Sequence, residues 1–205
     1  MSTRQKIFLV LLAMVFIGGH ASAQERIDAP VWNVGDKWTL TFKDSYTVKS
    51  ADEDTYTVLW ENVSGTKEST TIYDRSNLNA IGIVEGGKRK EYQGSRRKFL
   101  DFPLYPGKTW KDRSVSRPAR SGIGDPEHIY LHEFKVIGWE DVEVKAGKFK
   151  ALKIEYRQQI SGRDARGKAW YWYSPEVKNI VKMQYEKVRF WMSINDWEVI
   201  SFELK

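Results

Sequence analysis

The sequence predicts an all-β protein whose antiparallel sheet is strongly curved, as a half-barrel or a sandwich, with little or no helix. Three observations predict this class. Apolar and polar residues alternate with a period of two in many short runs, and glycine-containing turns separate those runs. About ten to twelve runs follow one another at spacings of about ten residues, as in sandwiches and barrels. At 41% hydrophobic and 29% charged residues, the composition fits neither a disordered tail nor a multi-pass membrane protein.

Residues 1–23 are predicted to be a secretory signal peptide. Arg4 and Lys6 carry the only charges there, an unbroken apolar run follows, and Ala21-Ser22-Ala23 offers a small-x-small cleavage site. The apolar run is shorter than the ~20 residues that cross a bilayer, and an uncleaved anchor is the alternative. We expect residues 24–205 to form a single all-β domain without a transmembrane segment, in the bacterial periplasm or secreted.

The chain contains no cysteine. This excludes disulfides, thiolate zinc sites, thiol nucleophiles and a lipidated N-terminal cysteine. Because oxidising compartments usually favour disulfides, packing of the core must hold this fold without them.

The strand pattern is clearest at residues 37–43, where Trp38, Leu40 and Phe42 point to one side and polar residues to the other. Further β-rich runs lie at residues 56–60, 70–73, 81–84, 88–93, 170–173, 181–185 and 197–204.

Two turns predict hairpins. Both residues of Gly86-Gly87 can take positive φ, which suits a two-residue turn, and a second hairpin is centred on Ala146-Gly147. In the strand after the second turn, the apolar positions shift by one residue, from Phe149 and Ala151 to Leu152. This shift predicts a β-bulge near Ala151.

Residues 125–137 fit two structures. Asp125-Pro126-Glu127 could begin a helix, and Gly138 could end one. We predict a strand, because residues 134–137 are β-rich and run directly into a second β-rich stretch.

Four sequence blocks occur in order along the chain. They are Trp32-x-Val34-Gly35-Asp36-Lys37-Trp38, Phe102-Pro103-Leu104-Tyr105-Pro106-Gly107-Lys108-x-Trp110, Val142-x-Val144-x-Ala146-Gly147-x-Phe149-x-Ala151 and Trp172-Tyr173-Ser174-Pro175-Glu176-Val177. In this order they resemble uncharacterised bacterial cell-envelope proteins of a domain-of-unknown-function family, distantly like half-barrel lipoprotein carriers. The resemblance implies an all-β periplasmic or secreted protein and supplies no catalytic residues. The chain departs from the family at Lys145, where proline is usual, and lacks the amphipathic helices that cover the groove of the carriers.

The sequence offers little catalytic or metal chemistry. On a strand, His128 and His132 would lie ~13 Å apart, too far to share a metal ion, and on the competing helix they would be neighbours without a third ligand. Glu155, Glu176 and Glu186 lie nearest the aromatic strands and are the candidate carboxylates of a hydrolase; solvated strand-face charges are the simpler interpretation. We therefore expect no metal, no cofactor and no enzymatic activity.

The middle of the chain is basic. Between residues 86 and 120, eleven lysines and arginines stand against three carboxylates. Such asymmetry can steer anionic partners, which in the envelope are lipid head groups, lipopolysaccharide or acidic polysaccharide rather than nucleic acid. The alternative is that these charges protect an edge strand from pairing with other chains. The candidate anion-binding residues are Lys88, Arg89, Lys90, Arg96, Arg97 and Lys98.

An aromatic run at Trp170-Tyr171-Trp172-Tyr173 places two tryptophans on one face of a strand and two tyrosines on the other. One face should be core. The other either packs under a loop or lines a groove that stacks on sugars or holds acyl chains. These four residues, with Trp191, are the candidate ligand-binding residues, and Trp197 could join them.

Taken together, these features predict a non-catalytic envelope protein that binds a hydrophobic or amphiphilic ligand, either lipid or polysaccharide. A structural or assembly partner of another envelope protein is the first alternative. A carboxylate-dependent hydrolase is the second.

Overall fold

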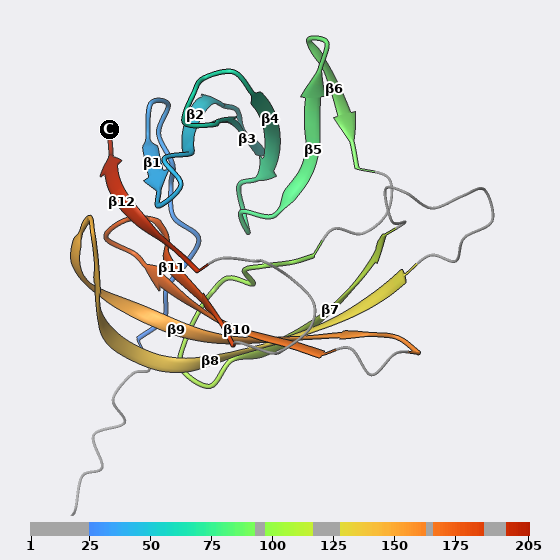
Figure 1. Ribbon diagram of the computed structural model, residues 1–205, viewed down its shortest axis with the longest axis vertical. Coiled ribbons are helices and arrows are strands. Elements are labelled where there is room, and N and C mark those ends of the chain that lie inside the picture. Colours follow the sequence, from blue (N-terminus) through green and yellow to red (C-terminus); the bar gives the residue numbers. More distant parts are fainter. Residues whose placement is uncertain (1–24, 93–96, 117–127, 163–165, 187–195) are drawn as a thin grey trace, which may run out of the picture.

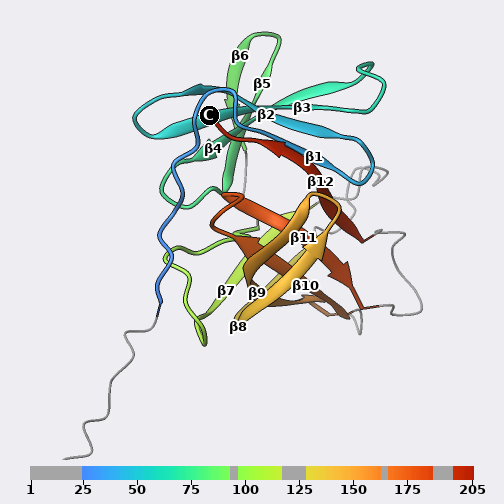
Figure 2. The same ribbon diagram turned by 90° about the vertical axis from the view of Figure 1, so that its left-hand side faces the viewer.

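Twelve antiparallel strands form one strongly curved sheet, seen in two orientations in Figures 1 and 2. This computed structural model describes residues 25–92, 97–116, 128–162, 166–186 and 196–205, so the predicted signal peptide lies outside the described residues. The strands are β1 (Lys37–Leu40), β2 (Ser45–Ala51), β3 (Thr55–Glu61), β4 (Glu68–Asp74), β5 (Ala80–Glu85), β6 (Lys88–Glu91), β7 (Thr109–Ser116), β8 (His128–Val144), β9 (Gly147–Ile160), β10 (Arg166–Ser174), β11 (Asn179–Tyr185) and β12 (Trp197–Glu203). The described ranges contain no helix, and hence none that could cross a bilayer. The predicted all-β class is confirmed.

The sheet consists of two meanders joined in its middle. Strands β1 to β6 run outward to one edge, and β7, at the opposite edge, begins a second meander that returns to the middle. There β12 pairs with β1, so the order is β6-β5-β4-β3-β2-β1-β12-β11-β10-β9-β8-β7. We call β1–β6 the first half and β7–β11 the second half. In Figure 1 the first half lies above the second, and β12 joins them on the left.

The local predictions with the strongest turn signals are confirmed. Gly86 and Gly87 have φ of 57° and 74° and connect β5 to β6. Gly82 in β5 is required for a different reason: a Cβ atom there would lie 2.6 Å from the carbonyl oxygen of Lys90. The ambiguous segment is a strand from His128 onward, since it forms the start of β8.

The predicted β-bulge near Ala151 is wrong. Strand β9 keeps its register with β8 through Ala151 and Leu152, and the extra residue is Ile137 in β8. The apolar positions shift by one residue because Ala151 and Leu152 point to opposite faces of β9, and both faces are covered by other side chains at this point. Ala151 and Leu152 are both fully buried, in different hydrophobic clusters.

Two clusters of buried side chains make up the core. The first cluster draws on both halves: Trp32, Trp38, Val48, Tyr56, Val58, Leu78, Val142, Val144, Phe149, Ala151, Trp172, Val177, Val181 and Val199. The second cluster covers the inner face of the second half: Leu100, Leu104, Trp110, Phe134, Val136, Leu152, Ile154, Tyr156, Ala169, Tyr171, Tyr173 and Met183.

The backbone ladder between the halves is short at one point, because β11 and β12 share only the pairs Lys182–Glu198 and Met183–Trp197. Two indole groups strengthen this junction. The Nε1–H of Trp38 donates to the carbonyl of Val177 (2.8 Å), and that of Trp32 donates to the carbonyl of Lys178 (2.9 Å). We call these two tryptophans, with Val177 and Lys178 of the β10–β11 turn, the tryptophan latch.

Asp36, which lies between the two tryptophans in the sequence, also contributes to this junction. Its side chain is fully buried and accepts hydrogen bonds from the backbone N–H of Asn33 (2.9 Å) and of Lys205 (2.7 Å). The Nζ of Lys178 lies 3.6 Å from the same carboxylate. The first and last of the recognisable sequence blocks therefore meet in space, and their shared role is structural.

Replacing Trp38 with phenylalanine should lower the free energy of unfolding by about 2–4 kcal/mol, because the change leaves the buried Val177 carbonyl unpaired and removes core volume. Urea unfolding, followed by circular dichroism, measures the loss. Trp60→Phe is the matched control: this half-buried residue donates to Asp44 at 3.3 Å within the first half, and its replacement should cost less than about 1 kcal/mol. Equal losses in the two variants would contradict the latch.

Candidate functional site

A cavity of about 460 Å³ lies between the two halves of the sheet. Its walls are mainly aromatic and aliphatic, and the charged residues among them are Asp44 and Arg97. The lining residues are Trp32, Trp38, Leu40, Phe42, Asp44, Tyr46, Val58, Tyr73, Leu78, Arg97, Phe99, Leu100, Tyr171, Asn179, Ile180, Met183, Tyr185 and Trp197. The polar side chains among them are Asp44, Arg97, Asn179 and four tyrosines.

The strand alternation directs these side chains inward from both halves. Trp38 and Tyr46 are register partners on β1 and β2, and Tyr171 and Met183 are partners on β10 and β11. Because partners in an antiparallel pair point to the same face, each pair contributes to one wall of the cavity.

The segment before β7 supplies a third wall. Residues 97–108 cross between the halves, and Leu100 is held through its backbone by Asn79, whose Nδ2 donates to the Leu100 carbonyl at 2.9 Å. This contact places Arg97 and Phe99 at the cavity. Phe99 also makes an edge-to-face contact with Tyr171, at a ring-centroid distance of 5.7 Å.

The aromatic run of β10 divides between the two faces as predicted, but only its tyrosine face meets the cavity. Tyr171 lines the cavity, and Tyr173 is completely buried in the second cluster. Burial raises the pKa of both hydroxyls well above the usual value, so both are neutral at physiological pH.

The tryptophan face of β10 is covered by charged side chains. Trp172 is buried, donates from Nε1 to Glu140 (2.9 Å), and lies beneath the ammonium groups of Lys153 and Lys182. Trp170 lies beneath Lys168, whose Nζ is 4.8 Å from the ring centroid. These contacts leave little open indole face for stacking on a sugar.

Trp191 and Arg96, two of the candidate residues, lie outside the described part of the chain. Trp197, by contrast, lines the cavity beside its register partner Met183.

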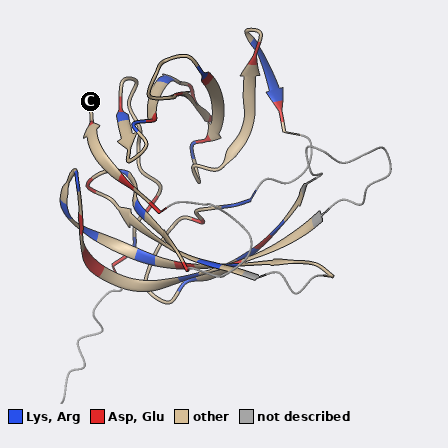
Figure 3. Cartoon of the chain, viewed as in Figure 1, with Lys and Arg blue, Asp and Glu red and all other residues tan. Residues whose placement is uncertain are grey.

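The basic candidate set does not form one site. Lys88, Arg89 and Lys90 are exposed on β6, the edge strand of the first half, where Figure 3 shows a concentration of positive charge. Lys90 forms an ion pair with Glu85 on the neighbouring strand. Because β6 is an edge strand, its charged side chains are placed where they would hinder pairing with another chain, as the alternative interpretation of these residues requires.

The remaining basic candidates lie away from this edge. Lys98 forms an ion pair with Asp101. Arg97 turns inward: its Nη1 donates to the Tyr156 hydroxyl (2.8 Å), and its guanidinium carbon lies 3.7 Å from the ring centroid of Phe99.

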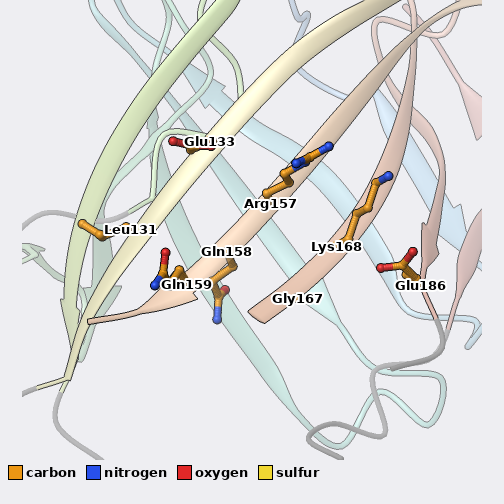
Figure 4. Close-up of a pocket in the computed structure, with 8 residues that line it drawn as sticks. All are labelled: Leu131, Glu133, Arg157, Gln158, Gln159, Gly167, Lys168 and Glu186. Atoms are coloured by element: carbon orange, nitrogen blue, oxygen red, sulfur yellow. The ribbon is translucent and has the colours of Figure 1, made fainter. Parts of the chain in front are cut away.

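A second hollow, of about 510 Å³, lies at the end of the second half and is lined by Leu131, Glu133, Arg157, Gln158, Gln159, Gly167, Lys168 and Glu186 (Figure 4). Its cations are largely paired. Arg157 and Lys168 contact the carboxylate of Glu155 at 2.8 and 2.9 Å. Although burial alone would raise the pKa of Glu155, these two partners hold it below its usual value, which is unsuitable for a general acid.

The three candidate carboxylates are not assembled into a catalytic pair. Glu176 is exposed on the β10–β11 turn, whereas Glu186 follows β11 and bonds through its backbone to Lys168 at the other end of β10. Among the described residues, no group of three or more histidine and carboxylate side chains could hold a metal ion.

A buried polar chain in the second half was not predicted from the sequence. His132 has Nε2 2.7 Å from Ser114 Oγ and Nδ1 3.0 Å from the Tyr156 hydroxyl, which donates in turn to Gln158 at 2.7 Å. Since Tyr156 uses its one proton on Gln158, His132 Nδ1–H must donate to Tyr156, and Ser114 must donate to Nε2. His132 is thereby fixed in one neutral tautomer.

This serine–histidine geometry resembles that of an activated nucleophile, but its electrostatics oppose catalysis. Burial, helped by the charge of Arg97, lowers the pKa of His132 to about 4. A tyrosine rather than a carboxylate orients the ring, and neither Ser114 nor His132 lines either described hollow. A base this weak, which lines neither of these two hollows, is better suited to holding strands β7, β8 and β9 together.

No protein-family model matches the chain, and no curated protein sequence matches it. Two solved structures are similar over most of it. One is a Bacteroides fragilis protein described as exported with a YmcC-like fold (13% identity, TM-score 0.41, 87% of this chain and 100% of that chain). The other is a Parabacteroides distasonis protein described as a lipoprotein (14% identity, TM-score 0.40, 88% and 100%). Similarity at this level assigns neither a family nor a function to this chain.

Protonation of His132 should destabilise the protein at mildly acidic pH. Its pKa is about 4 in the folded state against 6.5 ordinarily, so its stabilising effect is present above pH 6.5 and is lost as pH falls towards 4. The loss in unfolding free energy is at most about 3 kcal/mol. Urea unfolding across this range should give a shallower pH dependence for His132→Gln than for the unmodified protein. Parallel pH profiles would exclude this role.

Proposed function

We propose that the protein binds an amphiphilic, mainly apolar ligand in the cavity between the two halves of the sheet. The observation that carries the proposal is the composition of the cavity walls, in which Trp38, Phe99, Tyr171 and Met183 bring apolar surface from both halves to one space. Ligand sites are typically apolar clefts of roughly 300–1,000 Å³ with few polar groups, and this cavity falls within that range.

The walls favour an acyl chain over a polysaccharide. A sugar polymer carries many hydroxyl groups, and most of them would lose hydrogen bonds to water against walls that are mainly aromatic and aliphatic. An acyl chain has no such cost and gains about 0.8 kcal/mol per buried CH₂. The predicted signal peptide, if it directs export, would bring the chain to a compartment rich in acyl lipids.

Native mass spectrometry of protein purified without detergent is the direct test. The expected result is a bound species of lipid-like mass that organic solvent extracts and that quenches tryptophan fluorescence when added back, since Trp32, Trp38 and Trp197 line the cavity. Protein that carries nothing, and whose fluorescence no acyl compound alters, would refute the proposal.

Obstructing the cavity should weaken binding. Leu40 lies on the cavity wall and is half-buried, so Leu40→Trp places a larger side chain in the space without opening a hole in the core. Binding of an acyl probe, measured by calorimetry, should weaken by about tenfold or more, equivalent to about 1.4 kcal/mol. Leu131→Trp is the matched control, because Leu131 is 41% exposed and lies outside this cavity; its binding should be unchanged. Equal affinities in both variants would show that the ligand binds elsewhere.

A further inference from the structure

Arg97 is the cation in the wall of the mainly apolar cavity. Its guanidinium carbon lies 3.7 Å from the Phe99 ring centroid and 5.1 Å from that of Tyr156. One amino group donates to the Tyr156 hydroxyl at 2.8 Å. The side chain is therefore fixed in orientation by two aromatic residues.

Arg97 has no ion-pair partner among the residues that the structure describes. No described carboxylate lies within ion-pair distance, and Nε is buried without a hydrogen-bond partner among the described residues. The neighbouring cations of the same segment differ, since Lys98 and Lys108 both pair with Asp101. Asp44, the other charged residue of the cavity, accepts a hydrogen bond from Trp60.

A partly buried cation without a counter-ion is costly, and an anion that enters the same space removes that cost. The planar guanidinium group can form two parallel hydrogen bonds with a carboxylate or a phosphate. Apolar walls and one positioned guanidinium together select a molecule with an apolar body and an acidic end.

Resting on the proposed function, we propose that the ligand is a single-chain amphiphile with an acidic head group, which Arg97 binds while the chain lies against Phe99, Tyr171 and Met183. The head group is a carboxylate or a phosphate. Arg97 thus determines specificity among amphiphiles of the same chain length, and the apolar walls determine that a chain binds at all.

Four probes of equal chain length separate these contributions: palmitate, hexadecyl phosphate, hexadecanol and hexadecyltrimethylammonium. Calorimetry below their micelle-forming concentrations gives the affinities. We expect one or both acidic probes to bind about ten- to a hundredfold more tightly than hexadecanol, in keeping with hydrogen bonds between charged groups, and the cationic probe to bind least. The stronger of the two acidic probes identifies the head group.

The variant Arg97→Gln should lose this preference and bind acidic probes and hexadecanol alike. Retained hexadecanol binding shows that the variant is folded and its cavity intact, and Arg97→Lys should restore part of the preference. Arg89→Gln, which removes the same charge from exposed β6, should match the unmodified protein.

The outcomes distinguish the two proposals. If all four probes bind with similar affinity and Arg97→Gln changes nothing, the cavity binds acyl chains and the role of Arg97 is refuted. If Arg89→Gln weakens acidic probes as much as Arg97→Gln, overall charge rather than this side chain is responsible, which also refutes it. If no probe binds the unmodified protein, the proposed function itself fails.

Discussion

Hydrogen bonds from two indole groups to the β10–β11 turn hold the two halves of the sheet together. They lie close to the place where the backbone ladder between the halves is shortest, with two residue pairs between β11 and β12. Trp32 and Trp38 approach the β10–β11 turn from the first half, and the carbonyls of Lys178 and Val177 accept their N–H groups. An indole N–H or a carbonyl that is buried without a partner costs about 1–3 kcal/mol. The two indole N–H groups and the two carbonyls are therefore hydrogen-bonded to each other only when the halves are in contact, and this couples the two meanders into one structure.

The cavity is a consequence of the same arrangement. The halves meet through the tryptophan latch, and the segment containing Phe99 and Leu100 connects them a second time. Between these contacts the curved sheet leaves a space whose walls are the inward side chains of strands that would otherwise pack on one another. A chain without cysteine depends on large apolar side chains for its core, and Trp38 serves both as core and as cavity wall.

Local features of the fold were predictable from the sequence, whereas contacts between distant segments were not. Period-two alternation predicts β1 and β3, although β1 ends at Leu40 and the predicted continuation to residue 43 is a turn. Gly86-Gly87 predicts the β5–β6 hairpin, because these signals lie within a few residues. The phase shift at Ala151 was visible, but its cause, burial on both faces of β9, depends on strands far away in the sequence. The bulge is at Ile137 instead, in the partner strand.

The candidate site shows the same division. The aromatic run of β10 correctly indicated a tyrosine face and a tryptophan face, and Tyr171 does line the cavity. Proximity in the sequence groups Arg97 with the basic residues of β6, yet its side chain turns inward towards Phe99 and Tyr156. The pairing of His132 with Ser114 and Tyr156 spans three strands, so no local motif marks it.

The pairing of β12 with β1 also has a consequence for synthesis. Ribosomes produce the first half long before β12 and the β10–β11 turn. In the nascent chain, the aromatic inner face around Trp38 and Tyr56 is therefore exposed until those two segments have been synthesised. During that interval this face is an apolar surface that chaperones can bind.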